Sequence, residues 1–192
     1  MKLYLASTSK TRKDILNKVG LKHLSIPSNV EEVTTADNNE QYLINLSILK
    51  AKAVADKLVE GVIIGADSMI CFNKKRIGKP KDKIEAKQIL YALSGKINYA
   101  LTGVTIIDLY QNKTISFCEK TKVYFDKLSE EEIEWYIDNE NHILERAGYS
   151  LAGKTAIFIP KIDGDYYNVL GMPICRLYKE LAKLGYKIND FE

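Results

Sequence analysis

The sequence predicts an α/β fold in which helices flank a mixed β-sheet, and three observations support this prediction. Apolar runs of strand length alternate with stretches of helical periodicity along the chain. The 192 residues are a little more than the roughly 150 of a typical domain. No repeat, linker or break in composition divides them, and 46% of them are hydrophobic. We therefore expect a single domain over residues 1–192 with a sizeable core.

The N-terminal part contains two predicted strands and two predicted helices. A short apolar strand at residues 3–6 precedes a helix that Gly20 closes at its C′ position. Residues 24–30 follow as a second predicted strand. Residues 42–58 carry a helical apolar stripe and are the second predicted helix.

The middle of the chain contains its most apolar run, residues 62–72, which we predict to be a buried central strand. It turns at residues 73–75 into a hairpin or a loop. Asp82 and Glu85 have the N-cap and N3 spacing of a helix start, and Gly95 closes that helix.

The C-terminal half contributes three further strands and two further helices. A polar turn at residues 111–113 joins the first two of these strands, and Ser129 with Glu132 forms a capping-box pattern. The predicted elements are strands at residues 99–109, 115–125 and 156–159, a helix from Ser129, and a helix at residues 174–184.

The charge is unevenly distributed, although the net charge is only +3. Residues 1–30 hold six cations against one acid, and residues 71–90 hold seven cations against two acids. Residues 126–145 hold eight acids against one lysine, which suits a solvated helix face. The small net charge disfavours a nucleic-acid-binding protein, whereas the two basic stretches are suited to binding a small anion.

Targeting and redox features indicate a soluble, cytoplasmic protein. No stretch approaches the roughly 20 apolar residues of a membrane span, and the N-terminus lacks the apolar core of a signal peptide. The three cysteines are far apart and form no C-x-x-C pair, so we expect neither a disulfide framework nor a zinc site. We expect no membrane partner.

The loop after the first strand is a candidate anion site. Ser9 is a plausible N-cap, and Arg12 falls in the first helical turn, where a cation is disfavoured unless a negative ligand is present. An ordinary capped helix with solvated basic side chains remains the alternative.

A lysine of the second helix falls on its buried side. With Leu43 at 0° and about 100° per residue, Lys50 lies near 340°, within the apolar stripe, and Lys52 lies near 180°. A buried ammonium group needs a negative partner or a polar cavity. The alternative is that Lys50 extends along the apolar surface to solvent.

Asp67 lies within the apolar strand at residues 62–72, where a carboxylate needs a cation or has a raised pKa. A structural, hydrogen-bonded aspartate is the alternative. Lys79 in a turn and the acidic pair Glu31-Glu32 complete a set suited to Mg²⁺-assisted chemistry on phosphates. The P-loop, Rossmann, zincin and serine-hydrolase motifs are absent.

Eight short segments occur in a characteristic order. They are LASTSKTR (5–12), VEE (30–32), KAKA (50–53), IGADS (64–68), GKP (78–80), LSG (93–95), TGV (102–104) and GDYYNVLGMP (164–173). In order and spacing they resemble the Maf (septum-formation) family of nucleoside triphosphate pyrophosphatases. The resemblance implies a two-lobed fold with a long mixed sheet and a cleft between the lobes, similar to the fold of inosine triphosphatases. It also implies that the protein is a homodimer. It also implies Mg²⁺- or Mn²⁺-dependent hydrolysis between the α and β phosphates.

The resemblance also assigns roles to residues of this chain. Asp67 matches the catalytic aspartate, either the water-activating base or a metal ligand, and Glu31 matches its acidic partner at the metal. Lys50 and Lys79 match the phosphate-binding lysines. The loop that cradles the phosphates is matched by Ser7, Ser9 and Arg12.

Three departures concern the choice of nucleotide. Thr11, Ser68 and Ala152 stand where members that act on dTTP and UTP usually have arginine, threonine and glutamine. The arginine guanidinium usual at position 11 and the glutamine amide usual at position 152 are both missing. Their loss should weaken hydrogen bonding to the edge of a pyrimidine base. The preferred base stays open at this point.

Two functions remain in view. The first is an enzyme that clears unwanted or modified nucleotides from the pool. The alternative is a nucleotide-binding regulator of cell division in which hydrolysis is slow or incidental. Every catalytic position carried over from the resemblance is filled, which favours the enzyme.

Overall fold

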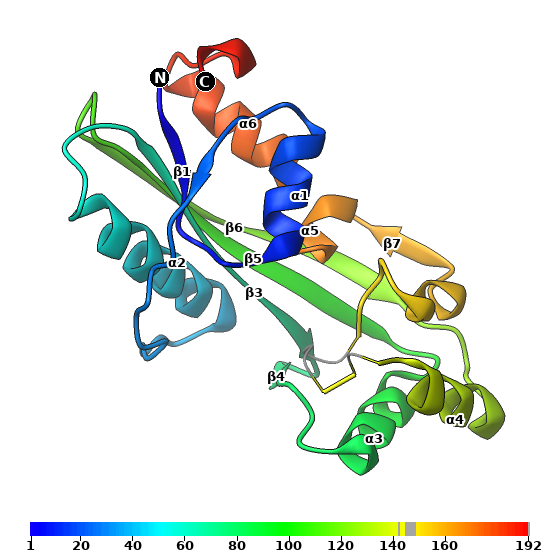
Figure 1. Cartoon of the computed structure of the whole chain (residues 1–192). Helices are drawn as coiled ribbons and strands as arrows, with labels where there is room; N and C mark the ends of the chain where they lie inside the picture. The colour runs from blue at the N-terminus through cyan, green and yellow to red at the C-terminus, as the bar shows by residue number, and fades with distance from the viewer. Residues whose placement is uncertain (142, 145–148, 192) are drawn as a thin grey trace. The chain divides into compact units, whose positions relative to one another are not determined.

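A mixed β-sheet with helices on both sides forms the fold, which confirms the predicted α/β class (Figure 1). The computed structural model describes residues 1–141, 143–144 and 149–191. Within them six of the seven strands follow the order β2-β1-β3-β5-β6-β7, and the seventh, β4, pairs with β3 outside this path. The strands are β1 (Leu3–Leu5), β2 (Leu24–Ser25), β3 (Val62–Phe72), β4 (Lys75–Ile77), β5 (Ile97–Asp108), β6 (Lys113–Tyr124) and β7 (Lys161–Asp163).

Six α-helices and two 3₁₀ helices are present among the described residues. None of them is long and apolar enough to cross a membrane. They are α1 (Lys10–Lys18), α2 (Asn39–Ala55), α3 (Lys83–Leu93), α4 (Glu130–Asn139), η1 (Lys154–Phe158), α5 (Tyr166–Val169), α6 (Ile174–Lys183) and η2 (Ile188–Asp190).

The chain divides into two compact units. Unit 1 comprises residues 1–68, 102–119 and 171–192, and unit 2 comprises residues 69–101 and 120–170. Strands β3, β5 and β6 contribute residues to both units.

In unit 1, helices α1 and α2 lie on opposite faces of the sheet (Figure 1). Strand β1 pairs in parallel with both β2 and β3. The crossover through α1 runs from β1 to β2, and the crossover through α2 runs back across β1 to β3. Such crossovers are right-handed, and these two run in opposite directions across the sheet. The two helices therefore lie on opposite faces.

Two glycines allow α2 to approach the sheet closely. A Cβ at Gly65 would lie 2.3 Å from the carbonyl oxygen of Ser47, and one at Gly103 would lie 2.4 Å from the carbonyl carbon of Leu43. No side chain fits at such distances, so both positions require glycine. The contact fixes how deeply α2 sits against β3 and β5.

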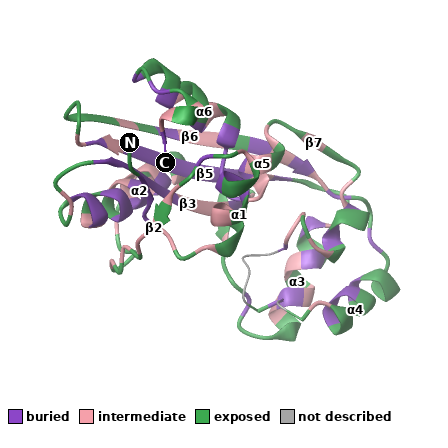
Figure 2. Cartoon of the chain, turned by 45° about the horizontal axis from the view of Figure 1, so that its top comes forward, coloured by how far each residue is buried: buried purple, intermediate pink, exposed green. Residues whose placement is uncertain are grey.

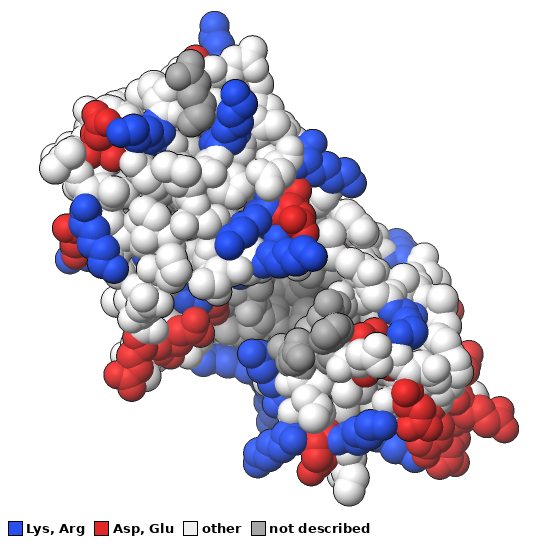
Figure 3. Space-filling view, viewed as in Figure 1, with Lys and Arg blue, Asp and Glu red and all other residues white. Residues whose placement is uncertain are grey.

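Unit 2 has its own core, which α3, α4 and the sheet enclose. Buried residues from both helices pack against β5 and β6, and β5 is buried at most of its positions (Figure 2). The acidic side chains of α4 gather on one surface of this unit (Figure 3). Lys87 of α3 forms ion pairs with Glu130 and Glu134, and Lys83 pairs with Asp138. Part of the second basic stretch is therefore neutralised by the acidic helix.

Most predicted elements are confirmed, including the bounds of β3 and the capping boxes or N-caps of α1, α3 and α4. The predicted strand at residues 156–159 is wrong, because this segment lies in and after the 3₁₀ helix η1. Thr155 donates to the carbonyl of Ser150 and so closes a turn there. Phe158 is buried, while Ile157 is 66% exposed, which places one apolar side chain of the segment in solvent.

Three further differences concern short elements. The strand predicted at residues 24–30 is only two residues long in the structure. Strand β7 and helix α5 were not predicted. The side chain of Asp165 accepts hydrogen bonds from the backbone of Tyr167 and Asn168 and thereby caps α5.

Candidate active site

The centre of the candidate site is an ion pair between α2 and β3. Lys50 Nζ lies 2.5 Å from Oδ1 of Asp67 and 2.7 Å from Oε1 of Glu32. The side chains of Lys50 and Asp67 are only 9% and 16% exposed, whereas Glu32 is 57% exposed. A nearly buried cation thus faces one nearly buried carboxylate and one carboxylate at the solvent boundary.

The packing of α2 explains why Lys50 is buried. Gly65 faces α2, and side chains two residues apart on a strand share a face, so Asp67 also faces α2. Lys50 lies on the buried stripe of the helix, and Lys52 is exposed. The predicted difference between the two lysines is confirmed, and snorkelling of Lys50 to the surface is not observed.

Arg12 lies on the other face of β3, between three segments of unit 1. Its Nε donates to the carbonyl of Gly171 at 2.9 Å, and its Nη2 donates to Oγ of Ser68 at 2.9 Å. A longer bond of 3.4 Å joins Nη1 to Oγ of Ser7. Burial lowers the pKa of the Arg12 guanidinium, while the charges of Asp67 and Glu32 act to raise it.

The loop between β1 and α1 leads into a helix N-terminus that a serine side chain caps. Ser9 is the N-cap of α1, and its hydroxyl accepts a hydrogen bond from the backbone of Arg12. Ser7 Oγ accepts from the backbone of Ser9 at 3.1 Å. The first turn of α1 contains no acidic residue, so its N–H groups and helix dipole favour a negative ligand.

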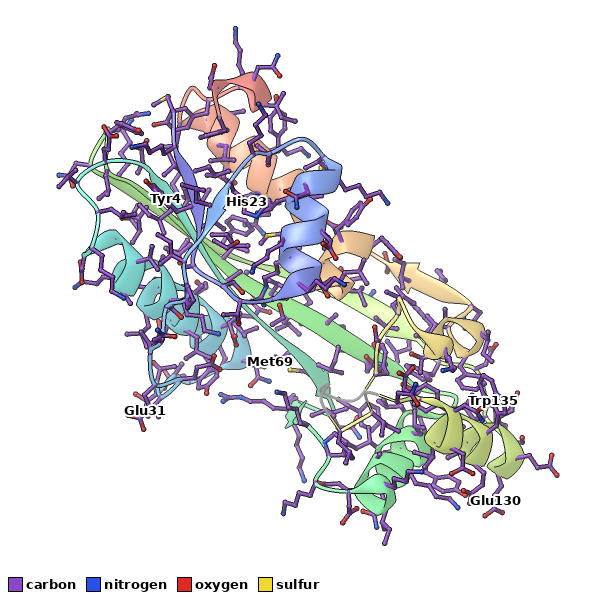
Figure 4. The ribbon with its side chains drawn as sticks, in the orientation of Figure 1. Tyr4, His23, Glu31, Met69, Glu130 and Trp135 are labelled. Atoms are coloured by element: carbon purple, nitrogen blue, oxygen red, sulfur yellow. The ribbon has the colours of Figure 1, made fainter. Side chains whose placement is uncertain are left out.

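The remaining predicted residues are placed as follows. Glu31 is exposed on the loop before α2 (Figure 4), and among the described residues it is Glu32 that contacts Lys50. Thr11 is exposed on α1. Lys79 and Ala152 belong to unit 2, where both are exposed. Unit 1 therefore brings together Ser7, Ser9, Arg12, Lys50, Asp67 and Ser68.

Sequence reasoning gave no role to Thr102 or Gly171, and it named Glu32 only as a member of the acidic pair Glu31-Glu32. Glu32 adjoins the residue chosen from the resemblance, and its contact with Lys50 depends on the loop conformation. Thr102 and Gly171 both lie in segments that resemble the family, but only the fold shows that they meet Ser68.

The carboxylates suit a hard divalent cation. One oxygen of Asp67 and one oxygen of Glu32 lie close to Lys50 Nζ, so the two carboxylates meet at the ammonium group of Lys50. In the part of the chain that the structure describes, no group of three or more His, Cys, Asp or Glu could hold a metal. Two carboxylates are nevertheless sufficient for Mg²⁺ in many phosphate-binding sites, because substrate phosphates and water supply the other ligands.

Comparisons with known proteins give a consistent result. A family model described as Maf-like protein matches residues 2–184. A dTTP/UTP pyrophosphatase of Carboxydothermus hydrogenoformans is 43% identical over 186 residues, which cover 97% of this chain and 100% of that protein. A protein of the same description from Bacillus anthracis is 38% identical over 189 residues, covering 98% of each chain.

Solved structures overlap with this chain less extensively. A nucleoside-triphosphatase (dITP/XTP pyrophosphatase) of Mycobacterium abscessus aligns with a TM-score of 0.44 and 11% identity, over 67% of this chain and 76% of that one. The Ham1 protein of Staphylococcus aureus aligns with a TM-score of 0.47 and 14% identity, over 69% and 88% respectively.

Proposed function

The chain belongs to the Maf family, and from that membership we propose that it is a nucleoside triphosphate pyrophosphatase. It cleaves the bond between the α and β phosphates and releases a nucleoside monophosphate and pyrophosphate. The observation that carries the proposal is the nearly buried pair of Lys50 and Asp67 in the same unit as the loop and Arg12. This arrangement offers a carboxylate and several cations to one polyphosphate.

Each group has a role that its chemistry supports. The N–H groups of the first turn of α1 and the guanidinium of Arg12 bind phosphate oxygens. Lys50 neutralises charge on the phosphate that is attacked, and Asp67 accepts the proton of the attacking water. Lys79, which the resemblance names as a second phosphate-binding lysine, has the same proposed role as Lys50.

A divalent metal ion belongs to the proposal. Glu32 and, in its alternative role as a metal ligand, Asp67 would hold Mg²⁺ or Mn²⁺, and the resemblance names Glu31 in place of Glu32. When bound, the ion neutralises phosphate charge and polarises the phosphoryl group. A homodimer and a cytoplasmic location are further parts of the proposal, and analytical ultracentrifugation tests the dimer.

The relatives' descriptions make dTTP and UTP the first substrates to test. Thr11 and Ala152 lack the arginine and glutamine usual in members that act on these nucleotides, so we propose that the base is recognised loosely. Clearing unwanted or modified nucleotides from the pool is the cellular role that fits such a site.

The test is pyrophosphate release from a panel of canonical and modified nucleoside triphosphates, with Mg²⁺ and with Mn²⁺. We expect release by the wild type and a loss of about a hundredfold or more in Asp67→Asn, since amide nitrogen and oxygen do not accept the proton. Equal rates in the two proteins would remove Asp67 from its role. Nucleotide binding without release from any nucleotide would support the regulator of cell division instead.

A further inference from the structure

The hydroxyl group of Ser68 contacts three groups of the protein. It accepts a hydrogen bond from Nη2 of Arg12 at 2.9 Å and donates to the carbonyl of Gly171 at 3.4 Å. The hydroxyl of Thr102 lies 3.0 Å away and forms a hydrogen bond with it in which either oxygen can be the donor. A serine hydroxyl has one donor and two acceptor sites, and three protein groups already contact this one, which leaves little capacity for a nucleobase.

Arg12, by contrast, retains capacity for a ligand. Three of its five N–H groups are used, on Gly171, Ser68 and Ser7. The other two, one on each terminal nitrogen, have no partner among the described residues. A guanidinium group that three hydrogen bonds hold in place and that keeps two N–H groups for a ligand is suited to binding phosphate oxygens.

Gly171 brings a distant part of the chain into this arrangement. Its φ of +92° lies in the region that favours glycine, and a Cβ there would lie 3.2 Å from Oγ of Ser68. Its carbonyl accepts hydrogen bonds from both Arg12 and Ser68. The carbonyl and the hydroxyl therefore fix the orientation of the guanidinium from two sides.

The direction of the side chain also separates Ser68 from the reacting groups. Neighbouring residues of a strand point to opposite faces, so Ser68 faces Arg12 while Asp67 faces α2 and Lys50. We propose that Ser68 is a positioning residue, which orients Arg12 toward the polyphosphate and does not read the base. The proposal rests on the proposed function and departs from the expectation that Ser68 determines specificity.

Inorganic triphosphate is the probe that separates the two roles, because it has phosphates and no base. A residue that reads the base has no effect on its binding, whereas a residue that orients Arg12 does. We expect calorimetry to show that Ser68→Ala binds triphosphate about ten- to a hundredfold more weakly than the wild type, as for the loss of a hydrogen bond to a charged group. Ser116→Ala, which loses a bond to Thr105 in the same unit, is the matched control with unchanged affinity.

Ser68→Thr and Ser68→Val form a second pair that differs only in the hydroxyl group. We expect the threonine variant to bind triphosphate as the wild type does and the valine variant to bind as weakly as the alanine variant. In an Arg12→Ala background, Ser68→Ala should cause no further loss, because its effect acts through Arg12. The ratio of kcat/KM between dTTP and dCTP should stay constant in all Ser68 variants.

The proposal would be overturned if Ser68→Ala and Ser68→Val bound triphosphate with wild-type affinity and had a shifted ratio of kcat/KM between dTTP and dCTP. Ser68 would then be a residue that recognises the base. An additive loss in the Arg12→Ala background would also overturn it. Failure of the wild type to bind triphosphate or to release pyrophosphate is a different result, which contradicts the proposed function itself.

Discussion

Lys50 Nζ and Asp67 Oδ1 lie 2.5 Å apart, and they join α2 to β3 across 17 residues of sequence. Both side chains are nearly buried, and the pair lies next to the place where Gly65 lets the helix meet the strand. Burying one charge without the other would be strongly unfavourable, so the two side chains depend on each other. The candidate site is therefore part of the packing between helix and sheet.

The first prediction separates Lys50 from its neighbour Lys52. Lys50→Ala should reduce pyrophosphate release by about a hundredfold or more, because it removes a positioned cation from the phosphates. Lys52→Ala removes an exposed cation of the same helix and should leave the rate unchanged. Steady-state release at saturating nucleotide measures both. Comparable losses in the two variants would mean that the position of Lys50 is not what matters.

The second prediction concerns Glu31 and Glu32. Glu32→Gln should weaken Mn²⁺ binding by about tenfold or more, since its carboxylate converges with that of Asp67 on one cationic centre. Glu31→Gln is the matched control, because in the described part of the chain it is Glu32 and Asp67, and not Glu31, that pair with Lys50. Electron paramagnetic resonance of free Mn²⁺ gives both affinities without turnover. A larger effect of Glu31→Gln would favour the residue that the resemblance names.

The comparisons of Lys50 with Lys52 and of Glu31 with Glu32 show what the sequence can predict. The burial of Lys50 follows from helical periodicity, and the bounds of β3 follow from one unbroken apolar run, so local patterns were sufficient. The contact of Glu32 with Lys50 depends on a loop of irregular conformation, for which no periodic pattern exists. Arg12 and Gly171 are 159 residues apart, and only the folded chain brings them together.

The third prediction tests the close approach of α2 to the sheet. Gly103→Ala places a methyl group 2.4 Å from the backbone of Leu43, so the helix must move away. We expect the free energy of unfolding to fall by about 1–3 kcal/mol, as for other overpacked sites. Urea denaturation measures this change. Gly78→Ala is the control, since its Cβ would meet no atom within 4 Å, and an equal loss there would contradict the argument from packing.

The last prediction concerns stability in alkaline solution. The hydroxyl of Tyr186 donates to Oδ2 of Asp108 at 2.7 Å, and burial, reinforced by this bond, raises the pKa of Tyr186 to about 12. An unfolded tyrosine loses its proton near pH 10. Between pH 10 and pH 12 the folded state therefore holds a proton that the unfolded state has lost, and unfolding releases it. The free energy of unfolding should fall with rising pH in this window, by at most about 1.4 kcal/mol per pH unit for this group.

Tyr186→Phe should remove this contribution, so its unfolding free energy should fall less steeply from pH 10 to pH 12 than that of the wild type. Tyr149, whose pKa is also raised by burial, keeps its own contribution in the variant. Tyr178→Phe is the control, because Tyr178 is 42% exposed, and its profile should match the wild type. Urea denaturation at half-unit pH intervals measures all three proteins. A Tyr186→Phe profile parallel to that of the wild type would show that the bond to Asp108 does not hold the proton of Tyr186 in the folded state.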